Sequence, residues 1–160
     1  MPIAIVAIGV PGSGKTTFLK AFAERHGFAY INKDAIRAEM LGDIRDQSKN
    51  REVWLESERR ITDALARGQS VALDSTYAER WKRRELVTSL KKRGATKVIG
   101  LYFDVPYERA LQQNRNADRE LVVTERDMRW FQDQLEKDPP NLDEGFDALY
   151  GFEELDQELV

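Results

Sequence analysis

Short apolar runs alternate with segments of helical periodicity along the chain. The first run, Ile3 to Ile8, is continuously apolar, rich in Ile and Val, and ends at Gly9. Such a run predicts a strand that is buried on both faces, as in a parallel sheet. Similar runs recur at Phe28–Ile31, Ser70–Leu73 and Val98–Phe103, and Phe146 to Phe152 is a candidate edge strand. This alternation predicts an α/β fold with a parallel sheet.

The segments between these runs place apolar side chains on one helical face each. The sets are Phe18, Leu19, Phe22 and Ala23; Trp54, Ile61 and Leu65; Trp81, Leu86 and Leu90; and Met128, Phe131 and Leu135. We expect their aromatic residues to belong to the core rather than to a ligand platform. Basic clusters at Arg59-Arg60, Lys82-Arg83-Arg84 and Lys91-Lys92-Arg93 are expected to be solvated helix faces. Residues 42–50 and 114–121 lack periodicity and are candidate mobile loops.

Composition limits the class of protein. The 160 residues, 41% of them hydrophobic, are enough for one compact domain, which we place at residues 1–152, followed by an acidic tail at 153–160. No apolar run approaches the ~20 residues that cross a bilayer, and there is no cysteine. Both observations favour a cytoplasmic protein with no membrane partner. The net charge of −3 argues against a broad nucleic-acid-coating surface, so any contact with a polynucleotide should be local.

A phosphate-binding motif follows the first strand. Residues 9 to 17 read Gly-Val-Pro-Gly-Ser-Gly-Lys-Thr-Thr and match G-x-x-x-x-G-K-[ST]. Glycines let the backbone N–H groups wrap around an anion, and the helix that follows directs its positive dipole end at it. We predict that Lys15 reaches the β- and γ-phosphates of ATP and that Thr16 holds Mg²⁺. The predicted ATP-binding residues of this loop are Gly12, Ser13, Gly14, Lys15, Thr16 and Thr17.

Two other readings of this loop are weaker. The dinucleotide fingerprint G-x-G-x-x-G has different glycine spacing, so a Rossmann oxidoreductase is not expected. A glycine-rich turn that binds nothing would not require strand, loop and helix to stand in this order. Asn32-Lys33-Asp34 is similar to the guanine-reading signature of GTPases but has the wrong spacing, and we treat that match as accidental.

Two acidic residues follow predicted strands and are candidates for chemistry. Asp34 comes directly after the second strand, at the carboxyl edge of the sheet, where it is placed to be a general base for an acceptor hydroxyl. Arg37, three residues later, lies on the same side of the next helical turn and is suited to bind an acceptor phosphate. Asp74 ends the third strand, where it would lie beside Mg²⁺ or the acceptor. The simpler alternatives are a helix cap for Asp34 and a strand-terminating aspartate for Asp74.

Arg115 and Arg119 lie in an aperiodic segment that follows a short helix. A planar, permanently charged guanidinium that closes over the γ-phosphoryl group would stabilise charge in the transition state. We therefore expect an arginine-bearing lid at about residues 114–122, with Arg119 catalytic and Arg115 on ATP. A solvated helix end, with arginines paired to Asp118 or Glu120, is the alternative.

These motifs together resemble the kinase domain of the phage polynucleotide 5′-kinases. The matching residues, in the same order, are the loop at 9–17, Tyr30 to Arg37, Leu73 to Thr76, Glu79-Arg80, Phe103 to Pro106, Arg115-Asn116-x-x-Arg119 and Glu144 to Asp147. The resemblance implies a three-layer P-loop kinase fold of about five parallel strands flanked by helices. It implies that Asp34 is the general base, that Arg37 binds the acceptor's phosphate, and that Asp74 and Arg119 are the third-strand aspartate and the lid arginine.

The resemblance also has departures. No phosphatase-like domain follows, so removal of 3′-phosphates is not expected of this chain, and the segment after Arg119 is short, which leaves open whether Arg115 or Arg119 contacts the γ-phosphate. The expected activity is transfer from ATP-Mg²⁺ to the 5′-hydroxyl of DNA or RNA. The alternatives are a hydroxymethylated pyrimidine in DNA, a nucleoside, a sugar or an antibiotic as acceptor, or a nucleotide switch or ATPase without an acceptor. The sequence does not indicate an oligomeric state.

Overall fold

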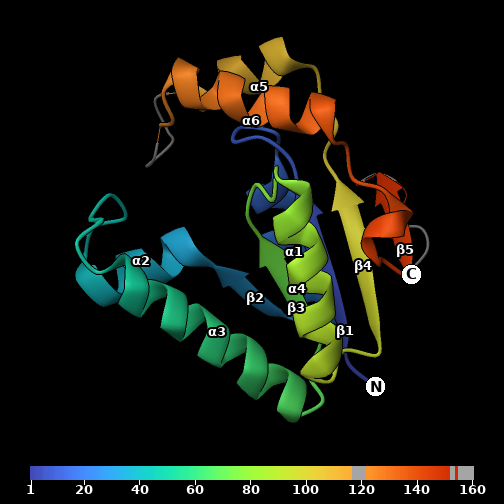
Figure 1. Cartoon of the computed structure of the whole chain (residues 1–160). Helices are drawn as coiled ribbons and strands as arrows, with labels where there is room; N and C mark the ends of the chain where they lie inside the picture. The colour runs from blue at the N-terminus through green and yellow to red at the C-terminus, as the bar shows by residue number, and fades with distance from the viewer. Residues whose placement is uncertain (117–121, 152–153, 155–160) are drawn as a thin grey trace.

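One five-stranded sheet forms the centre of the molecule (Figure 1). The computed structural model describes residues 1–116, 122–151 and 154. The strands are β1 (Ile3–Ile8), β2 (Ala29–Asn32), β3 (Val71–Asp74), β4 (Lys97–Tyr102) and β5 (Ala148–Gly151). They pair in parallel throughout, in the order β2-β3-β1-β4-β5. The predicted parallel α/β sheet is confirmed: β1 has the predicted bounds, and the ends of the other strands are displaced by one or two residues.

Helices connect the strands and cover the sheet. They are α1 (Lys15–His26), α2 (Lys33–Leu41), α3 (Asn50–Ala66), α4 (Arg80–Lys92), α5 (Tyr107–Asn114) and α6 (Glu125–Lys137), followed by the short 3-10 turn η1 (Leu142–Glu144). Figure 1 shows α5 and α6 lying together beyond the carboxyl ends of the strands. Because every strand points the same way, all of the loops that follow the strands open toward this edge.

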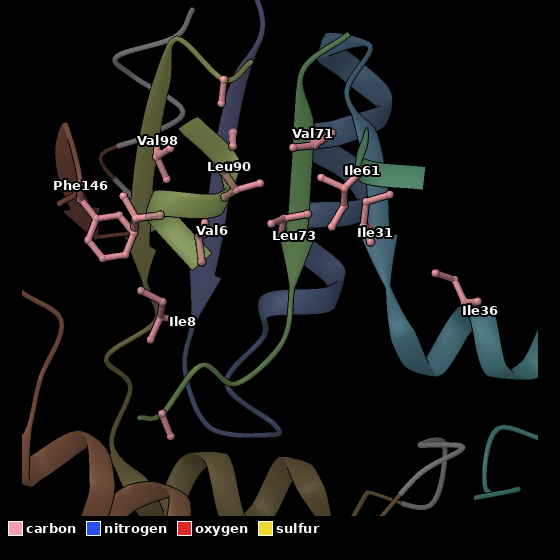
Figure 2. Packing of buried hydrophobic residues seen from close by; sticks show 14 of the residues in the cluster. Val6, Ile8, Ile31, Ile36, Ile61, Val71, Leu73, Leu90, Val98 and Phe146 are labelled. Carbon is pink, nitrogen blue, oxygen red and sulfur yellow. The ribbon is translucent and has the colours of Figure 1, made fainter. Parts of the chain in front are cut away.

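The two faces of the sheet are buried in separate hydrophobic layers. Along β1, Val6 and Ile8 belong to the layer under α3 and α4, whereas Ile5 and Ala7 belong to the layer under α1. Figure 2 shows Leu90 of α4 among Val6, Val98 and Leu73 of the sheet. This alternation explains the continuous apolar run in the sequence, since side chains on both faces of a central strand are excluded from water.

Two of the predicted core aromatic residues are instead at the surface. Trp54 is 48% exposed and Trp81 is 56% exposed, although Ile61 and Leu65 in the same predicted set as Trp54 are buried. Trp81 lies in the first turn of α4 and donates its indole N–H to Glu79 Oε2 at 2.8 Å. The prediction was wrong for these two because the buried faces of the helices run through other positions, Val53 and Ser57 in α3 and Arg83 and Val87 in α4.

The predicted position of Arg83 on a solvated helix face was also wrong. Its side chain is fully buried, and Nε and Nη2 donate to the two carboxylate oxygens of Glu144 at 2.7 Å each. The same guanidinium donates to the backbone carbonyls of Tyr77 (2.9 Å) and Asp138 (2.7 Å). One buried side chain therefore joins the loop after β3 to the end of α6 and to η1.

Candidate active site

The phosphate-binding loop leaves β1 at its carboxyl end and leads into α1. Gly12 and Gly14 have φ angles of 84° and 94°, in the left-handed region that glycine adopts without strain. A Cβ atom at Gly12 would lie 2.3 Å from the carbonyl oxygen of Ala110, whereas one at Gly14 would meet nothing within 4 Å. Gly12 is therefore required both by its backbone conformation and by the close approach of α5, and Gly14 by its conformation alone.

Polar side chains of this loop turn inward. Lys15 is only 6% exposed, and its Nζ donates to the carbonyl of Val10 at 3.1 Å. Ser13 is also buried, and its hydroxyl has no hydrogen-bond partner within the described part of the chain. A buried ammonium group and an orphaned hydroxyl beside a helix N-terminus fit the binding of a phosphate anion.

Asp74 lies beside Thr16 at the end of β3. Its Oδ2 atom accepts hydrogen bonds from the hydroxyl of Thr16 (2.8 Å), the hydroxyl of Tyr30 (2.5 Å) and the side-chain amide of Asn32 (3.0 Å). The parallel register of β2 and β3, in which Asn32 is opposite Asp74, brings two of these donors to it. Burial, and then the charge of Asp74, raise the pKa of the Tyr30 phenol well above its ordinary value. From the sequence, Asp74 was expected beside Mg²⁺ or the acceptor, and in the structure it bonds the hydroxyl of Thr16.

These residues suit Mg²⁺ by their chemistry. The hydroxyl of Thr16 and the carboxylate of Asp74 are hard oxygen donors within hydrogen-bond distance of each other. Among the described residues, no three His, Cys, Asp or Glu side chains gather in a metal-binding group. An ion bound here would complete its shell with phosphate and water oxygens, which is how Mg²⁺ is commonly held beside nucleotides.

Asp34 and Arg37 form the opposite side of the site. The N-cap of α2 is Asn32, whose Oδ1 accepts from the backbone N–H of Ala35 at 2.9 Å, so Asp34 is not the cap. Its Oδ1 instead accepts a 2.7 Å hydrogen bond from Arg37 Nη1, and the Asp34 side chain remains 46% exposed.

Arg37 is held from a second element. It is 8% exposed, and its Nη2 donates to Oδ1 of Asn50 at 3.2 Å, at the start of α3. The amide of Asn50 donates in turn to Gln47 Oε1 at 2.9 Å. The Nε atom of Arg37 is buried without a hydrogen-bond partner in the described residues. A buried guanidinium with an unused donor is suited to receive an anionic group.

One cavity of about 640 Å³ joins the two sides of the site. It brings together the predicted residues Gly12, Gly14, Lys15, Thr16, Thr17, Asp34, Arg37 and Asp74. It also contains residues to which the sequence analysis gave no role, namely Asn32, Lys33, Ser75, Thr76, Gln113 and Asn116. Most of these residues follow directly after a strand or precede the predicted lid. Their position at the carboxyl edge of the sheet was the signal in the sequence that could have identified them as cavity residues.

Lys33 is the cation that the sequence analysis passed over. The residue as a whole is exposed, but desolvation of its ammonium group lowers the pKa of Lys33. The carboxylate of Glu58 acts in the opposite direction and raises that pKa. Lys33 and Arg37 place two cations beside the single carboxylate of Asp34 on this part of the cavity wall, in a chain whose net charge is −3.

The predicted lid at about residues 114–122 lies partly outside the described residues. Arg119 lies outside the described residues. Arg115 forms an ion pair with Glu125 at the start of α6 and is not among the residues that line the cavity. Gln113 and Asn116 reach the cavity from the same segment instead.

No helix in the described ranges is both long and apolar enough to cross a membrane.

Comparisons with known proteins agree with this fold. A protein of Acanthamoeba polyphaga mimivirus, named as a bifunctional polynucleotide phosphatase/kinase, is 28% identical over 110 residues, which are 69% of this chain and 23% of the mimivirus protein. A chain of the Pnkp1/Rnl/Hen1 RNA repair complex superimposes with a TM-score of 0.74 at 21% identity, over 85% of this chain and 44% of that one. A Chloroflexus aurantiacus protein named as a kinase has a TM-score of 0.71 at 19% identity, over 99% and 96% of the two chains.

The chain thus spans under a quarter of the mimivirus relative and less than half of the repair-complex chain. The model of the AAA domain family AAA_33 matches residues 5–137, which include the phosphate loop, Asp34, Arg37 and Asp74. The chain therefore belongs to the AAA_33 family of AAA domains and has the fold of the P-loop kinases.

Proposed function

We propose that this protein transfers the γ-phosphoryl group of ATP to a hydroxyl of nucleic acid, the 5′-hydroxyl of DNA or RNA. The observation that carries the proposal is the pair formed by Asp34 and Arg37 across the cavity from Lys15 and Thr16. A carboxylate that can take a proton lies beside a buried guanidinium with an unused donor. An acceptor that presents both a hydroxyl and a phosphate, as a 5′-hydroxyl polynucleotide end does, matches both groups.

The proposed reaction assigns one role to each side chain. Asp34 accepts the proton of the acceptor hydroxyl, and the oxygen of that hydroxyl forms a bond to the γ-phosphorus while the bond from that phosphorus to the β–γ bridging oxygen breaks. Lys15 stabilises the negative charge on the β- and γ-phosphates. Arg37 binds the acceptor's phosphate and so holds its hydroxyl near Asp34. ADP leaves, and the acceptor carries the new phosphate.

Thr16 and Asp74 are the residues that would hold Mg²⁺. The ion would neutralise charge on the β- and γ-phosphate oxygens when bound. Arg119 stays the proposed lid arginine, in contact with the γ-phosphate. Arg115, which was assigned to ATP from the sequence, is the alternative for that contact.

A small-molecule acceptor, or a hydroxymethylated pyrimidine in DNA, is the second candidate. The net charge of −3 favours it, because a chain of this charge attracts a long polyanion less than a neutral alcohol. A switch or ATPase without an acceptor would need neither Asp34 nor Arg37. It predicts hydrolysis that is unaffected by loss of the Asp34 carboxylate.

Incubation with γ-labelled ATP and a set of acceptors distinguishes these candidates. The acceptors are 5′-hydroxyl DNA, 5′-hydroxyl RNA, DNA containing hydroxymethyluracil, nucleosides and sugars. Label on the 5′ ends of DNA or RNA is the expected result, and label confined to nucleosides or sugars would reject the proposal. The Lys15→Ala variant is the negative control, because it lacks the ammonium group that the phosphates require.

A further inference from the structure

Trp54 is a large aromatic residue at the surface beside the acceptor side of the cavity. It is 48% exposed. It lies one helical turn after Asn50 and one turn before Glu58, so these three side chains follow one another along the same side of α3. Figure 1 shows that this part of α3 begins next to α2, the helix that carries Asp34 and Arg37.

Both neighbours of Trp54 on this side contact or face cations of the cavity. Asn50 accepts a hydrogen bond from Arg37, and the carboxylate of Glu58, which pairs with Arg93 at 2.7 Å, raises the pKa of Lys33. Arg37 and Lys33 both line the cavity, whereas Trp54 is not part of the lining. Trp54 therefore lies on α3 between two residues that each act on a cation of the cavity wall.

We propose that the indole ring of Trp54 is a stacking platform for a nucleobase of the acceptor strand, close to the nucleotide whose hydroxyl faces Asp34. This inference rests on the proposed function and adds a residue that selects nucleobase-bearing acceptors. Charge complementarity identifies the occupant: Lys33 and Arg37 offer positive charge to phosphates from the cavity wall, and the segment of α3 that contacts Arg37 through Asn50 offers the exposed ring of Trp54. An aromatic ring beside a basic groove is how single-stranded nucleic acid is bound without sequence preference.

The other exposed tryptophans lack this combination. Trp81 donates to Glu79, and its ring is covered by Lys82, whose Nζ lies 5.6 Å from the ring centroid. Trp130 packs edge-on against Phe131, with ring centroids 5.3 Å apart. Among the described residues, the ring of Trp54 has neither an aromatic nor a cationic partner. Trp81 and Trp130 thus serve as matched controls of similar exposure.

The kinetic test compares two acceptors that differ only in the base of the 5′-terminal nucleotides, one intact and one abasic. Trp54→Ala should raise the KM for the intact acceptor about tenfold, the size expected for loss of one base–aromatic stack, and leave the KM for ATP unchanged. The KM for the abasic acceptor should be the same in wild type and variant, and Trp54→Phe should retain most of the wild-type affinity. Trp81→Ala should change neither KM.

Three outcomes would overturn the inference: an unchanged KM for the intact acceptor, an equal increase for the abasic acceptor, or the same increase in Trp81→Ala. Melting temperatures of all variants show whether any of them is unfolded, and the binding measurement below leaves Trp54 in place, so the inference stays testable if Trp54→Ala is unfolded.

A binding measurement separates this inference from the proposed activity. In a Trp81→Phe, Trp130→Phe background, Trp54 is the sole tryptophan, and its fluorescence should be quenched by a single-stranded oligonucleotide and not by an abasic strand of equal length. Absence of quenching would refute the stacking role. Quenching without any phosphorylation of polynucleotide ends would support stacking and reject the 5′-kinase proposal.

Discussion

The hydroxyl of Thr16 donates a 2.8 Å hydrogen bond to Asp74, so the first turn of α1 and the end of β3 meet at one carboxylate. We expect Asp74→Asn to preserve the shape of this junction and to remove its negative charge. Phosphoryl transfer should then require a Mg²⁺ concentration at least about tenfold higher, because one charged ligand is lost. Titration of the transfer rate with Mg²⁺ measures this, and Asp133→Asn, on the exposed face of α6, should titrate like wild type.

Replacing Asp34 with Asn should separate binding from chemistry. The variant loses the proposed proton acceptor, so transfer should fall by roughly 10²-fold or more while ATP binding persists. Single-turnover rates and ATP affinity, measured together, test the separation. Asp43→Asn is the control, since Asp43 is an exposed aspartate that bonds only its own loop through Arg45. Near-normal transfer by Asp34→Asn would leave Asp34 only a partner of Arg37.

The raised pKa of Tyr30 predicts a dependence on alkaline pH. Below about pH 10, the phenol is protonated in both the folded and unfolded chain. Above that value the unfolded chain loses the proton first, because burial and Asp74 hold the folded pKa higher. The free energy of unfolding should therefore decrease as pH rises above about 10, and less steeply in Tyr30→Phe. Denaturant unfolding at a series of pH values measures both slopes, and equal slopes would contradict the assignment.

Alanine at the two loop glycines should have unequal effects. Gly14→Ala introduces a side chain into open space at positive φ and should cost about 1–2 kcal/mol of stability. Gly12→Ala should cost more, because its Cβ would lie 2.3 Å from the carbonyl of Ala110 and α5 would have to move. Chemical denaturation gives the two values. A smaller loss for Gly12→Ala would mean that α5 is free to shift.

Removing one partner of the buried ion pair should strongly destabilise the fold. Arg83→Met leaves the carboxylate of Glu144 buried without its cation, which typically costs about 3–5 kcal/mol. Replacing both with apolar residues, as in Arg83→Met with Glu144→Leu, should recover much of that loss. Denaturant midpoints compare the variants, with Arg84→Ala as the exposed neighbour. Equal stability of the single and double variants would argue against a specific pair.

Sequence patterns predicted the elements whose causes are local. The apolar run of β1, the loop glycines and the order of strand and helix are encoded within a few residues, and the confirmed sheet follows from them. Asp34, Arg37 and Asp74 could be located because the carboxyl ends of parallel strands meet at one edge. Their roles in the reaction remain predictions.

Features that depend on distant partners were not predictable in this way. Arg83 has the local pattern of a solvated helix, and only the approach of Glu144, 61 residues later, explains its burial. Trp54 has the spacing of a core residue, but the buried positions in its turn of α3 are Val53 and Ser57, and Trp54 is exposed beside them. Arg115 has the spacing of a lid arginine and instead pairs with Glu125. Periodicity reports which side of a helix is apolar, and it does not report what lies opposite.

The guanidinium of Arg83 has a consequence for how related sequences can diverge. It holds the carbonyl of Tyr77, and the adjacent Thr76 carbonyl accepts from the N–H of Gly9 at the start of the phosphate loop. A change at position 83 or 144 alone would therefore disturb both the core and the backbone that bonds the start of the phosphate loop. Substitutions at these two positions should be inherited as compensating pairs, even though neither residue lines the cavity.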